Sequence, residues 1–116
     1  MRTAVAITGM GAITALGGTV RATWEGLVAG RVGIGPLTLF DTSKDRTHTA
    51  AQIQDFDPTN LVPAKELRRA SRGDLLGLHA AREAVLDAGI GETERGLRRA
   101  GVLLGGGAGA LLQAED

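Results

Sequence analysis

The amino-acid sequence predicts an α/β fold, and the arrangement of its apolar residues carries this prediction. Two short runs, residues 4–8 and 100–104, are apolar without polar alternation, and glycine follows each of them. Such runs are typical of parallel strands that are covered on both faces. Helical periodicity fills much of the sequence between them, so strand and helix patterns follow one another along the chain.

The first helix is predicted over residues 19–29, after a glycine-containing loop over residues 9–18. Thr19 is a suitable N-cap, and Gly30 stands where glycine usually ends a helix. The large apolar residues of this stretch recur at helical spacing and are expected on its buried face. They are Val20, Trp24, Leu27 and Val28.

The middle of the sequence predicts mostly irregular structure. Residues 31–49 contain glycine and proline and are expected to form no regular element, whereas residues 50–53 are expected to form a short edge strand. Pro63 is suited to the first turn of a helix, and we expect a short helix through Arg69.

A longer helix is predicted from Ser71 to Ala88. Ser71 with Asp74 three positions later has the spacing of a capping box, and Gly89 marks the end. The expected apolar stripe comprises Leu75, Leu78, Ala81, Val85 and Ala88. A charged connection over residues 90–99 leads to the second apolar run, and a glycine turn then leads into the start of a further helix.

Composition excludes several classes of protein. The length of 116 residues fits one domain, and 43% hydrophobic residues argue against disorder. Thirteen basic and thirteen acidic residues give no net charge that would attract nucleic acid or an anionic membrane. There is no cysteine, so these residues form no disulfide, thiolate metal site or cysteine nucleophile. No apolar run approaches the roughly 18 residues of a membrane span, and no signal peptide is evident. We therefore expect a cytoplasmic protein.

The number of predicted central strands indicates an incomplete fold. Two strands do not make an independently stable sheet, and the last helical pattern has barely begun at Asp116. We expect residues 1–116 to be the N-terminal piece of a larger α/β protein, with the remaining strands supplied by sequence outside this chain.

Two glycine loops raise the question of nucleotide binding. In the first loop, Gly9 and Gly11 are not followed by the third glycine of G-x-G-x-x-G, because Thr14 holds that position. Gly9 and Gly11 are therefore expected to allow positive φ and close backbone packing. In the second loop, Gly105, Gly107 and Ala110 do satisfy the G-x-G-x-x-[GA] pattern. A nucleotide-binding α/β domain thus stays open as an alternative.

Four stretches resemble the β-ketoacyl-acyl-carrier-protein synthases, the elongating condensing enzymes. The stretch "VAITGMGAITALGGTVRATWEGLVAGRVGIGPLTLFDTS" is similar to the N-terminus of that family. The stretches "AAQIQDFDPTNLVPAKELRR", "AAREAVLDAGI" and "AGVLLGGGAGALLQAED" resemble its next segments in collinear order. The resemblance covers essentially the whole chain and favours a structural turn, not a phosphate site, at the first glycine loop.

The resemblance implies a thiolase-like fold with αβαβα layers, of which this chain supplies part of the N-terminal half. It also implies an acyltransferase of fatty acid or polyketide biosynthesis. This enzyme condenses an acyl group with malonyl-carrier protein through a cysteine nucleophile and two histidines. Those three residues lie beyond residue 116 in the family's layout, so the chain alone is expected to be inactive, with no catalytic residue. No metal, nucleotide or other cofactor is implied. The implied partners are acyl carrier protein, acyl and malonyl thioesters, and a second subunit in a homodimer or heterodimer.

The resemblance also assigns candidate binding residues. Gly107 and Ala108 match the turn that lines the family's acyl pocket, and the small side chain of Ala108 predicts tolerance of longer or bulkier acyl chains. Basic residues of the segment around residue 65 match those that dock the acidic carrier protein. They are Lys65, Arg68 and Arg69, with Arg72 expected on the same helical face. His48 and His79 match neither catalytic histidine and are expected to be structural or on the surface.

One departure from the family pattern leaves two subfamilies open. The family usually has an aromatic residue after an arginine before the long helix, whereas this chain has Ala70, Ser71, Arg72 and Gly73. A divergent synthase of secondary metabolism fits this departure. The inactive chain-length-factor-type partner of a ketosynthase fits it equally well.

Overall fold

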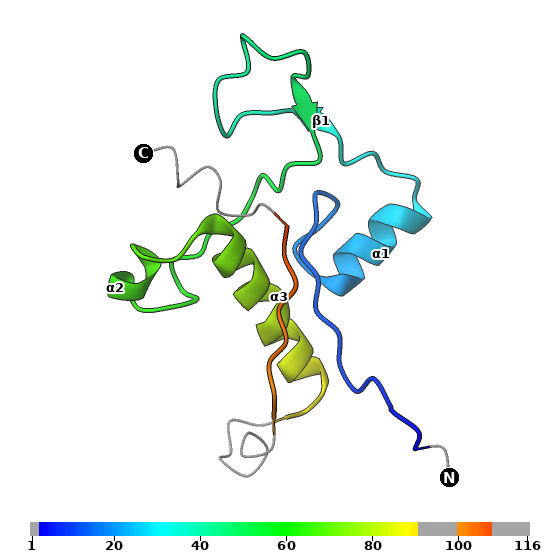
Figure 1. The fold of residues 1–116 in the computed structure, drawn as a ribbon. Coiled ribbons are helices and arrows are strands. Elements are labelled where there is room, and N and C mark those ends of the chain that lie inside the picture. Colours follow the sequence, from blue (N-terminus) through cyan, green and yellow to red (C-terminus); the bar gives the residue numbers. More distant parts are fainter. Residues whose placement is uncertain (1–2, 91–99, 108–116) are drawn as a thin grey trace. The chain divides into compact units, whose positions relative to one another are not determined.

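The computed structural model describes residues 3–90 and 100–107. Along the chain its elements are α1 (Val20–Val28), β1 (Gly35–Pro36), β2 (Thr49–Ala50), α2 (Ala64–Leu67) and α3 (Arg72–Asp87) (Figure 1). Contacts divide the chain into two compact units. One unit consists of residues 12–57, and the other combines residues 1–11 with residues 58–116. Residues 91–99 of the connection predicted over 90–99, and the helix expected after the second glycine loop, lie outside the described residues.

Helix α1 has the ends that the sequence predicts. The Thr19 hydroxyl accepts a hydrogen bond from the backbone N–H of Ala22 at 3.1 Å, which satisfies one of the free donors of the first turn. The helix closes at Ala29, and Gly30 follows with φ +65°. This left-handed conformation carries no steric penalty for glycine, so both caps are confirmed.

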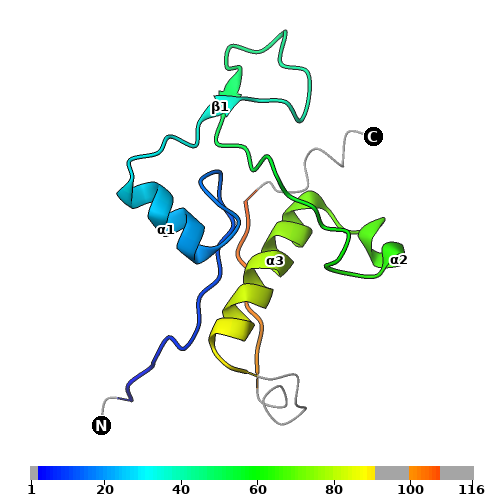
Figure 2. The ribbon, with the colours of Figure 1, turned by 180° about the vertical axis from the view of Figure 1, so that it is seen from behind.

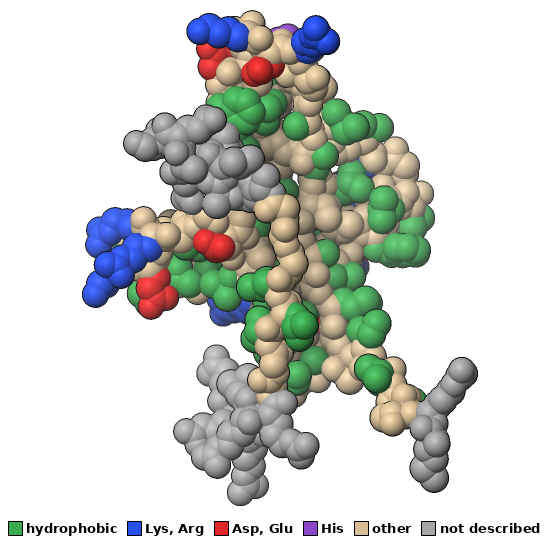
Figure 3. Space-filling model, in the orientation of Figure 1, with side chains coloured by type: hydrophobic (Ala, Val, Ile, Leu, Met, Phe, Trp, Pro, Cys, Tyr) green, Lys and Arg blue, Asp and Glu red, His purple; other side chains and the backbone are tan. Residues whose placement is uncertain are grey.

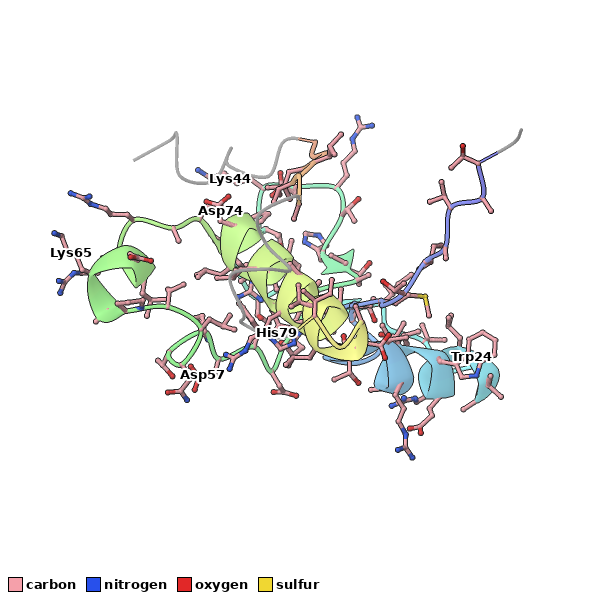
Figure 4. All side chains as sticks on the ribbon, turned by 90° about the horizontal axis from the view of Figure 1, so that it is seen from below. Trp24, Lys44, Asp57, Lys65, Asp74 and His79 are labelled. Atoms are coloured by element: carbon pink, nitrogen blue, oxygen red, sulfur yellow. The ribbon has the colours of Figure 1, made fainter. Side chains whose placement is uncertain are left out.

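The buried face of α1 is not the predicted one. Gly26 is buried, whereas Trp24 is 65% exposed and points away from the helix (Figure 4). The side of the helix that carries small residues packs on the preceding loop, where the hydroxyls of Thr14 and Thr23 lie 3.0 Å apart. Gly26 and Thr23 allow this close approach because their side chains are small. The side of the helix with large apolar residues faces outward. The prediction of a buried face was therefore wrong for Trp24, Leu27 and Val28, which are all exposed.

The short sheet of this unit differs in part from the prediction. Strands β1 and β2 are antiparallel, with Gly35 opposite Ala50 and Pro36 opposite Thr49. The strand expected at residues 50–53 is therefore present only at its first residue, and β1 lies in a stretch expected to be irregular. The ladder ends early because the side chain of Gln52, not a backbone carbonyl, accepts from the N–H of Thr38 at 2.9 Å.

In the other unit, the capping box before α3 is confirmed. The backbone N–H of Asp74 donates to the Ser71 hydroxyl at 3.0 Å, and the N–H of Ser71 donates to the Asp74 carboxylate at 2.9 Å. At the other end, Gly89 has φ +63°. Because both caps are local, the sequence predicts the bounds of α3 to within one residue. Figure 2 shows α3 from behind, with the single turn of α2 before it.

The apolar stripe predicted on α3 is wrong for Leu78, Ala81 and Val85, whereas Leu75 and Ala88 do lie on a packed side. Leu75 is buried, but Leu78 and Val85 are exposed by about two-fifths of their surface, and Ala81 is exposed. The packed side runs instead along the small residues Ala80, Ala84 and Ala88, which lie against residues 9–11. A side of the helix with small residues brings its backbone close to another chain segment, which larger side chains would prevent.

The two predicted central strands are absent as strands. Residues 4–8 and 100–104 form no ladder with any described residue, and all ten of these residues are exposed. This prediction was wrong for the chain as it stands, because a strand needs a neighbouring strand to satisfy its backbone groups. No helix of the described residues is long and apolar enough to span a bilayer.

Candidate functional site

Several backbone N–H groups of the first glycine loop donate hydrogen bonds within the protein. The N–H of Met10 donates to the Asp87 carboxylate at 2.9 Å. Farther along, Thr14 and Gly17 exchange two backbone hydrogen bonds of 2.9 and 3.2 Å, and the N–H of Leu16 donates to the Thr14 hydroxyl at 3.1 Å. A phosphate cradle needs several free N–H groups that converge on one point. The N–H groups of Met10, Thr14, Leu16 and Gly17 are therefore not free to bind a phosphate.

Gly9 and Gly11 are needed for close packing against α3. A Cβ atom added to Gly9 would lie 2.5 Å from the backbone nitrogen of Ala88, and one added to Gly11 would lie 2.8 Å from that of Ala84. The expected close packing is confirmed. The expected positive φ is wrong, since Gly30 and Gly89 are the glycines with positive φ among the described residues.

Asp87 is a positioning residue that the sequence interpretation missed. It ends α3 and accepts the Met10 hydrogen bond, so it holds the loop that follows residues 4–8 against the helix. A carboxylate at a helix C-terminus opposes the helix dipole. This unfavourable placement is the signal that could have identified Asp87 from sequence.

Three cations form what we call the α2 basic surface: Lys65 on α2, and Arg68 and Arg69 just after it. All three are exposed, and within the described part of the chain they make no ion pair or side-chain hydrogen bond. Figure 3 shows the positive side chains gathered over α2, and Figure 4 shows Lys65 directed away from it. Free, exposed cations of this kind mainly attract an acidic partner at a distance.

Arg72 does not share the helical face that the sequence predicts. Helix α2 ends at Leu67, and Arg72 is the first residue of α3. The spacing from Lys65 to Arg72 therefore spans a break between two helices, and the i, i+7 relation does not apply. The break has a local cause, because Ser71 adopts an extended conformation as the N-cap of α3.

The predicted acyl-pocket turn is described only in part. Gly105, Gly106 and Gly107 are exposed, and a Cβ atom added to any of them would have no atom of a described residue within 4 Å. Ala108 lies outside the described residues, as does Ala110. No described residue therefore crowds this half of the turn.

The two histidines have the surroundings expected for structural or surface residues. His48 is exposed, and its Nδ1 lies 3.1 Å from the Thr42 hydroxyl. His79 is half-buried in the middle of α3. No group of three or more potential metal ligands occurs among residues 3–90 and 100–107.

The loop between β1 and β2 encloses an open depression of about 400 Å³ that the sequence interpretation did not identify. Its lining combines two apolar side chains, three threonines, one acidic residue and one basic residue. These are Leu37, Phe40, Thr42, Asp45, Arg46, Thr47 and Thr49. Within the same loop, the N–H and hydroxyl of Ser43 both donate to the Asp41 carboxylate at 2.9 Å. These hydrogen bonds lower the pKa of Asp41 and stabilise the turn.

The other groups with a shifted pKa make hydrogen bonds that stabilise helices. Hydrogen bonds with the side chain and backbone of Ser71 lower the pKa of Asp74, which favours the ionised form at the positive end of α3. On α1, Arg21 donates to Glu25 at 2.8 Å, and this hydrogen bond raises the pKa of Arg21. Neither group lies in a described cavity. The described residues therefore contain an exposed basic surface but no assembled catalytic group.

Comparisons with known proteins agree on one family. Residues 2–116 match the family described as "Beta-ketoacyl synthase, N-terminal domain". The chain is 39% identical over 112 residues to the 3-oxoacyl-[acyl-carrier-protein] synthase 2 of Synechocystis sp.. This match covers 97% of the chain and 27% of that protein. The proteins of the same name from Coxiella burnetii and Staphylococcus aureus are 36% and 38% identical over 107 residues, and each match covers 92% of the chain and 26% of the relative.

A solved structure shares the fold. The structure titled "The ishigamide ketosynthase/chain length factor" matches with a TM-score of 0.66 and 38% sequence identity, over 74% of this chain and 21% of the matched one. The chain thus spans about a quarter of the length of its curated relatives. Its architecture is that of a ketosynthase N-terminal domain, consistent with a thiolase-like fold. The chain belongs to the β-ketoacyl synthase family, whose N-terminal domain it matches from residue 2 to residue 116.

Proposed function

We propose that this chain is the N-terminal part of a 3-oxoacyl-[acyl-carrier-protein] synthase. The complete enzyme would condense an acyl group with malonyl-carrier protein in fatty acid or polyketide biosynthesis. The observation that carries the proposal is the collinear match over 97% of the chain with a synthase of that name. The first glycine loop supports it as well, because several of its N–H groups donate within the protein and are not free to bind a phosphate.

The catalytic groups would come from outside these residues. The chain contains no cysteine, so it cannot form the acyl-enzyme on which this chemistry depends. In our proposal residues 1–116 are a partial N-terminal domain, and further polypeptide supplies the cysteine nucleophile and the two histidines. No step of the condensation is assigned to a residue of this chain.

The direct test is a condensation assay on the polypeptide that contains these residues together with the catalytic part. We expect transfer of the acyl group to a cysteine, followed by release of one carbon dioxide for each 3-oxoacyl-carrier protein formed. Residues 1–116 alone should give neither product. A complete polypeptide that forms no acyl-enzyme would contradict the proposal.

A chain-length-factor-type subunit is the second candidate. The structural match to a ketosynthase/chain length factor favours it, since that title names a pair of subunits. In this case the complete polypeptide would lack the nucleophile and would act only beside an active ketosynthase in a heterodimer. The condensation assay, done with and without an active partner subunit, separates the two candidates. A homodimer that is active by itself supports the first.

We further propose that the α2 basic surface docks acyl carrier protein. Its three cations are exposed and have no ion-pair partner among the described residues, so they are available to an acidic protein. Glu66 lies in the same helix and offsets part of the charge, which leaves a net positive surface. Charges at an interface rim mainly raise the association rate, and salt screens their effect.

Charge reversal tests this docking surface. The variant Arg68→Glu/Arg69→Glu should weaken carrier-protein binding about tenfold at low salt, or roughly 0.7 kcal/mol for each reversed arginine. The matched control is Arg46→Glu/Arg82→Glu, which changes net charge equally at two exposed positions. Binding is measured by fluorescence anisotropy with labelled carrier protein at low and high salt. Equal weakening by both variants would exclude specific docking.

Gly107 and Ala108 are proposed to line the acyl pocket. A small residue at position 108 leaves room for long or bulky acyl chains. In the complete synthase, Ala108→Phe should therefore shift products toward shorter chains, because the aromatic ring would occupy the end of the pocket. Ala108→Ser, a change of about one atom, is the control. An unchanged chain-length distribution in Ala108→Phe would contradict this role.

A further inference from the structure

The open depression between β1 and β2 has no part in the proposed condensation. Its volume of about 400 Å³ lies at the lower end of the range of small-molecule pockets, about 300–1,000 Å³. The loop that encloses it and both strands belong to the unit of residues 12–57, so a single unit of the chain forms it (Figure 1). Its size suits a small molecule, and its lining indicates the chemistry of that molecule.

Two opposite charges line this depression without neutralising each other. The Asp45 carboxylate and the Arg46 guanidinium are exposed, and neither side chain makes an ion pair or a hydrogen bond with another described residue. Figure 3 shows acidic and basic side chains close together over this loop. An anionic ligand would be repelled by Asp45 and a cationic one by Arg46, whereas a ligand with one group of each sign satisfies both. The charges therefore favour a zwitterion.

The rest of the lining adds apolar area and hydroxyl donors. Leu37 and Phe40 supply the apolar area, and Phe40 is 45% exposed, so its ring is accessible to a ligand. An apolar or aromatic group gains free energy by covering these side chains. The hydroxyls of Thr47 and Thr49 make no hydrogen bond with another described residue. They can donate to the carboxylate that Arg46 attracts.

Hydrogen bonds within the loop hold this lining in place. Beside the β1–β2 ladder, the N–H of Leu37 donates to the carbonyl of His48 at 2.9 Å. Farther out, the N–H of Asp45 donates to the carbonyl of Thr42 at 2.9 Å, and the Thr42 hydroxyl lies 3.1 Å from Nδ1 of His48. A ligand then has less of the loop to order, which lowers the entropy cost of binding.

We propose that the depression between β1 and β2 binds a free α-amino acid with an aromatic or large apolar side chain, such as phenylalanine. Arg46 binds the carboxylate of the amino acid, and Asp45 accepts hydrogen bonds from its ammonium group. Its side chain lies on Leu37 and Phe40. Because both charged residues are exposed to water, the affinity is low, with a Kd on the order of 1 mM.

The direct test is saturation-transfer nuclear magnetic resonance on the polypeptide that contains these residues together with the catalytic part. The ligands are phenylalanine, 3-phenylpropanoate, which lacks the ammonium group, and 2-phenylethylamine, which lacks the carboxylate. We expect saturable binding of phenylalanine and about fivefold weaker binding of each analogue, because each leaves one charge of the site unpaired. No saturable binding of phenylalanine, or equal binding of phenylalanine and either analogue, would overturn the proposal.

Matched variants locate the site. Arg46→Gln should weaken phenylalanine binding about fivefold without weakening that of 2-phenylethylamine, since the lost charge binds the carboxylate. Asp45→Asn should weaken phenylalanine binding by a similar factor without weakening that of 3-phenylpropanoate. The control is Lys44→Gln, because Lys44 is exposed in the same loop but does not line the depression. Equal weakening by Lys44→Gln and Arg46→Gln would refute the assignment. If a variant does not fold, the comparison of the three ligands on the unaltered protein still decides.

Discussion

Replacing Gly11 by alanine should release the loop of residues 9–11 from α3. The new methyl group would fall on the carbonyl of Ala80, and it would lie 2.7 Å from the carbon of that carbonyl and 2.8 Å from the backbone nitrogen of Ala84. All three of these atoms belong to the helix backbone. They cannot rotate aside as the end of a flexible side chain can, so either the loop or the helix must move.

The size of the effect follows from this geometry. An extra methyl group in a close-packed contact costs about 1–3 kcal/mol, and a contact with fixed backbone atoms belongs at the upper end, about 3 kcal/mol. Since 1.4 kcal/mol corresponds to a factor of ten, the population of the docked loop should fall about a hundredfold.

The Met10 amide reports this docking, because its hydrogen bond to Asp87 exists only while the loop lies on α3. Amide exchange measured by nuclear magnetic resonance should show faster exchange at Met10 in Gly11→Ala. The control is Gly18→Ala, since a Cβ atom at Gly18 meets nothing within 4 Å. Its effect should stay within about 0.5 kcal/mol. The same exchange rate at Met10 in both variants would refute the close-packing argument.

Three further predictions concern α3. Gly77→Ala should stabilise the helix by about 1 kcal/mol, because Gly77 is inside it with open space at the Cβ position; unchanged thermal melting by circular dichroism would contradict this. Ser71→Ala should destabilise the helix by about 1 kcal/mol through loss of the N-cap, with Ser71→Thr as the conservative control in the same melting experiment. The lowered pKa of Asp74 should make the helix sensitive to acid: the stabilisation is complete above the ordinary pKa of 3.8 and is lost as pH falls through the lower pKa of the folded state. An acid titration of helix content should therefore be flatter in Asp74→Asn, and identical curves would exclude the contribution.

The bounds of the helices could be predicted because their determinants are local. Thr19 caps α1 through an N–H three residues away, and Ser71 and Asp74 cap α3 across the same short distance. Gly30 and Gly89 end the two helices in a left-handed conformation that their own residue type permits. None of these interactions depends on a distant part of the chain, so sequence spacing is sufficient.

The candidate docking surface could be predicted in part. Lys65, Arg68 and Arg69 are exposed as expected, because charged side chains remain in water when no partner compensates them. The position of Arg72 could not be predicted from helical spacing, because the N-cap at Ser71 interrupts the helix before it. Asp87 was missed because its partner, Met10, is far away in sequence.

Residue periodicity predicts that a helix has an apolar side, but contacts with distant segments decide which side is buried. In α3 the side with small residues, including Ala80 and Ala84, packs on Gly9 and Gly11, because backbones without large side chains can approach closely. The apolar runs at 4–8 and 100–104 show the same dependence. Their composition is that of buried strands, yet a strand forms only beside another strand, and no described residue provides one.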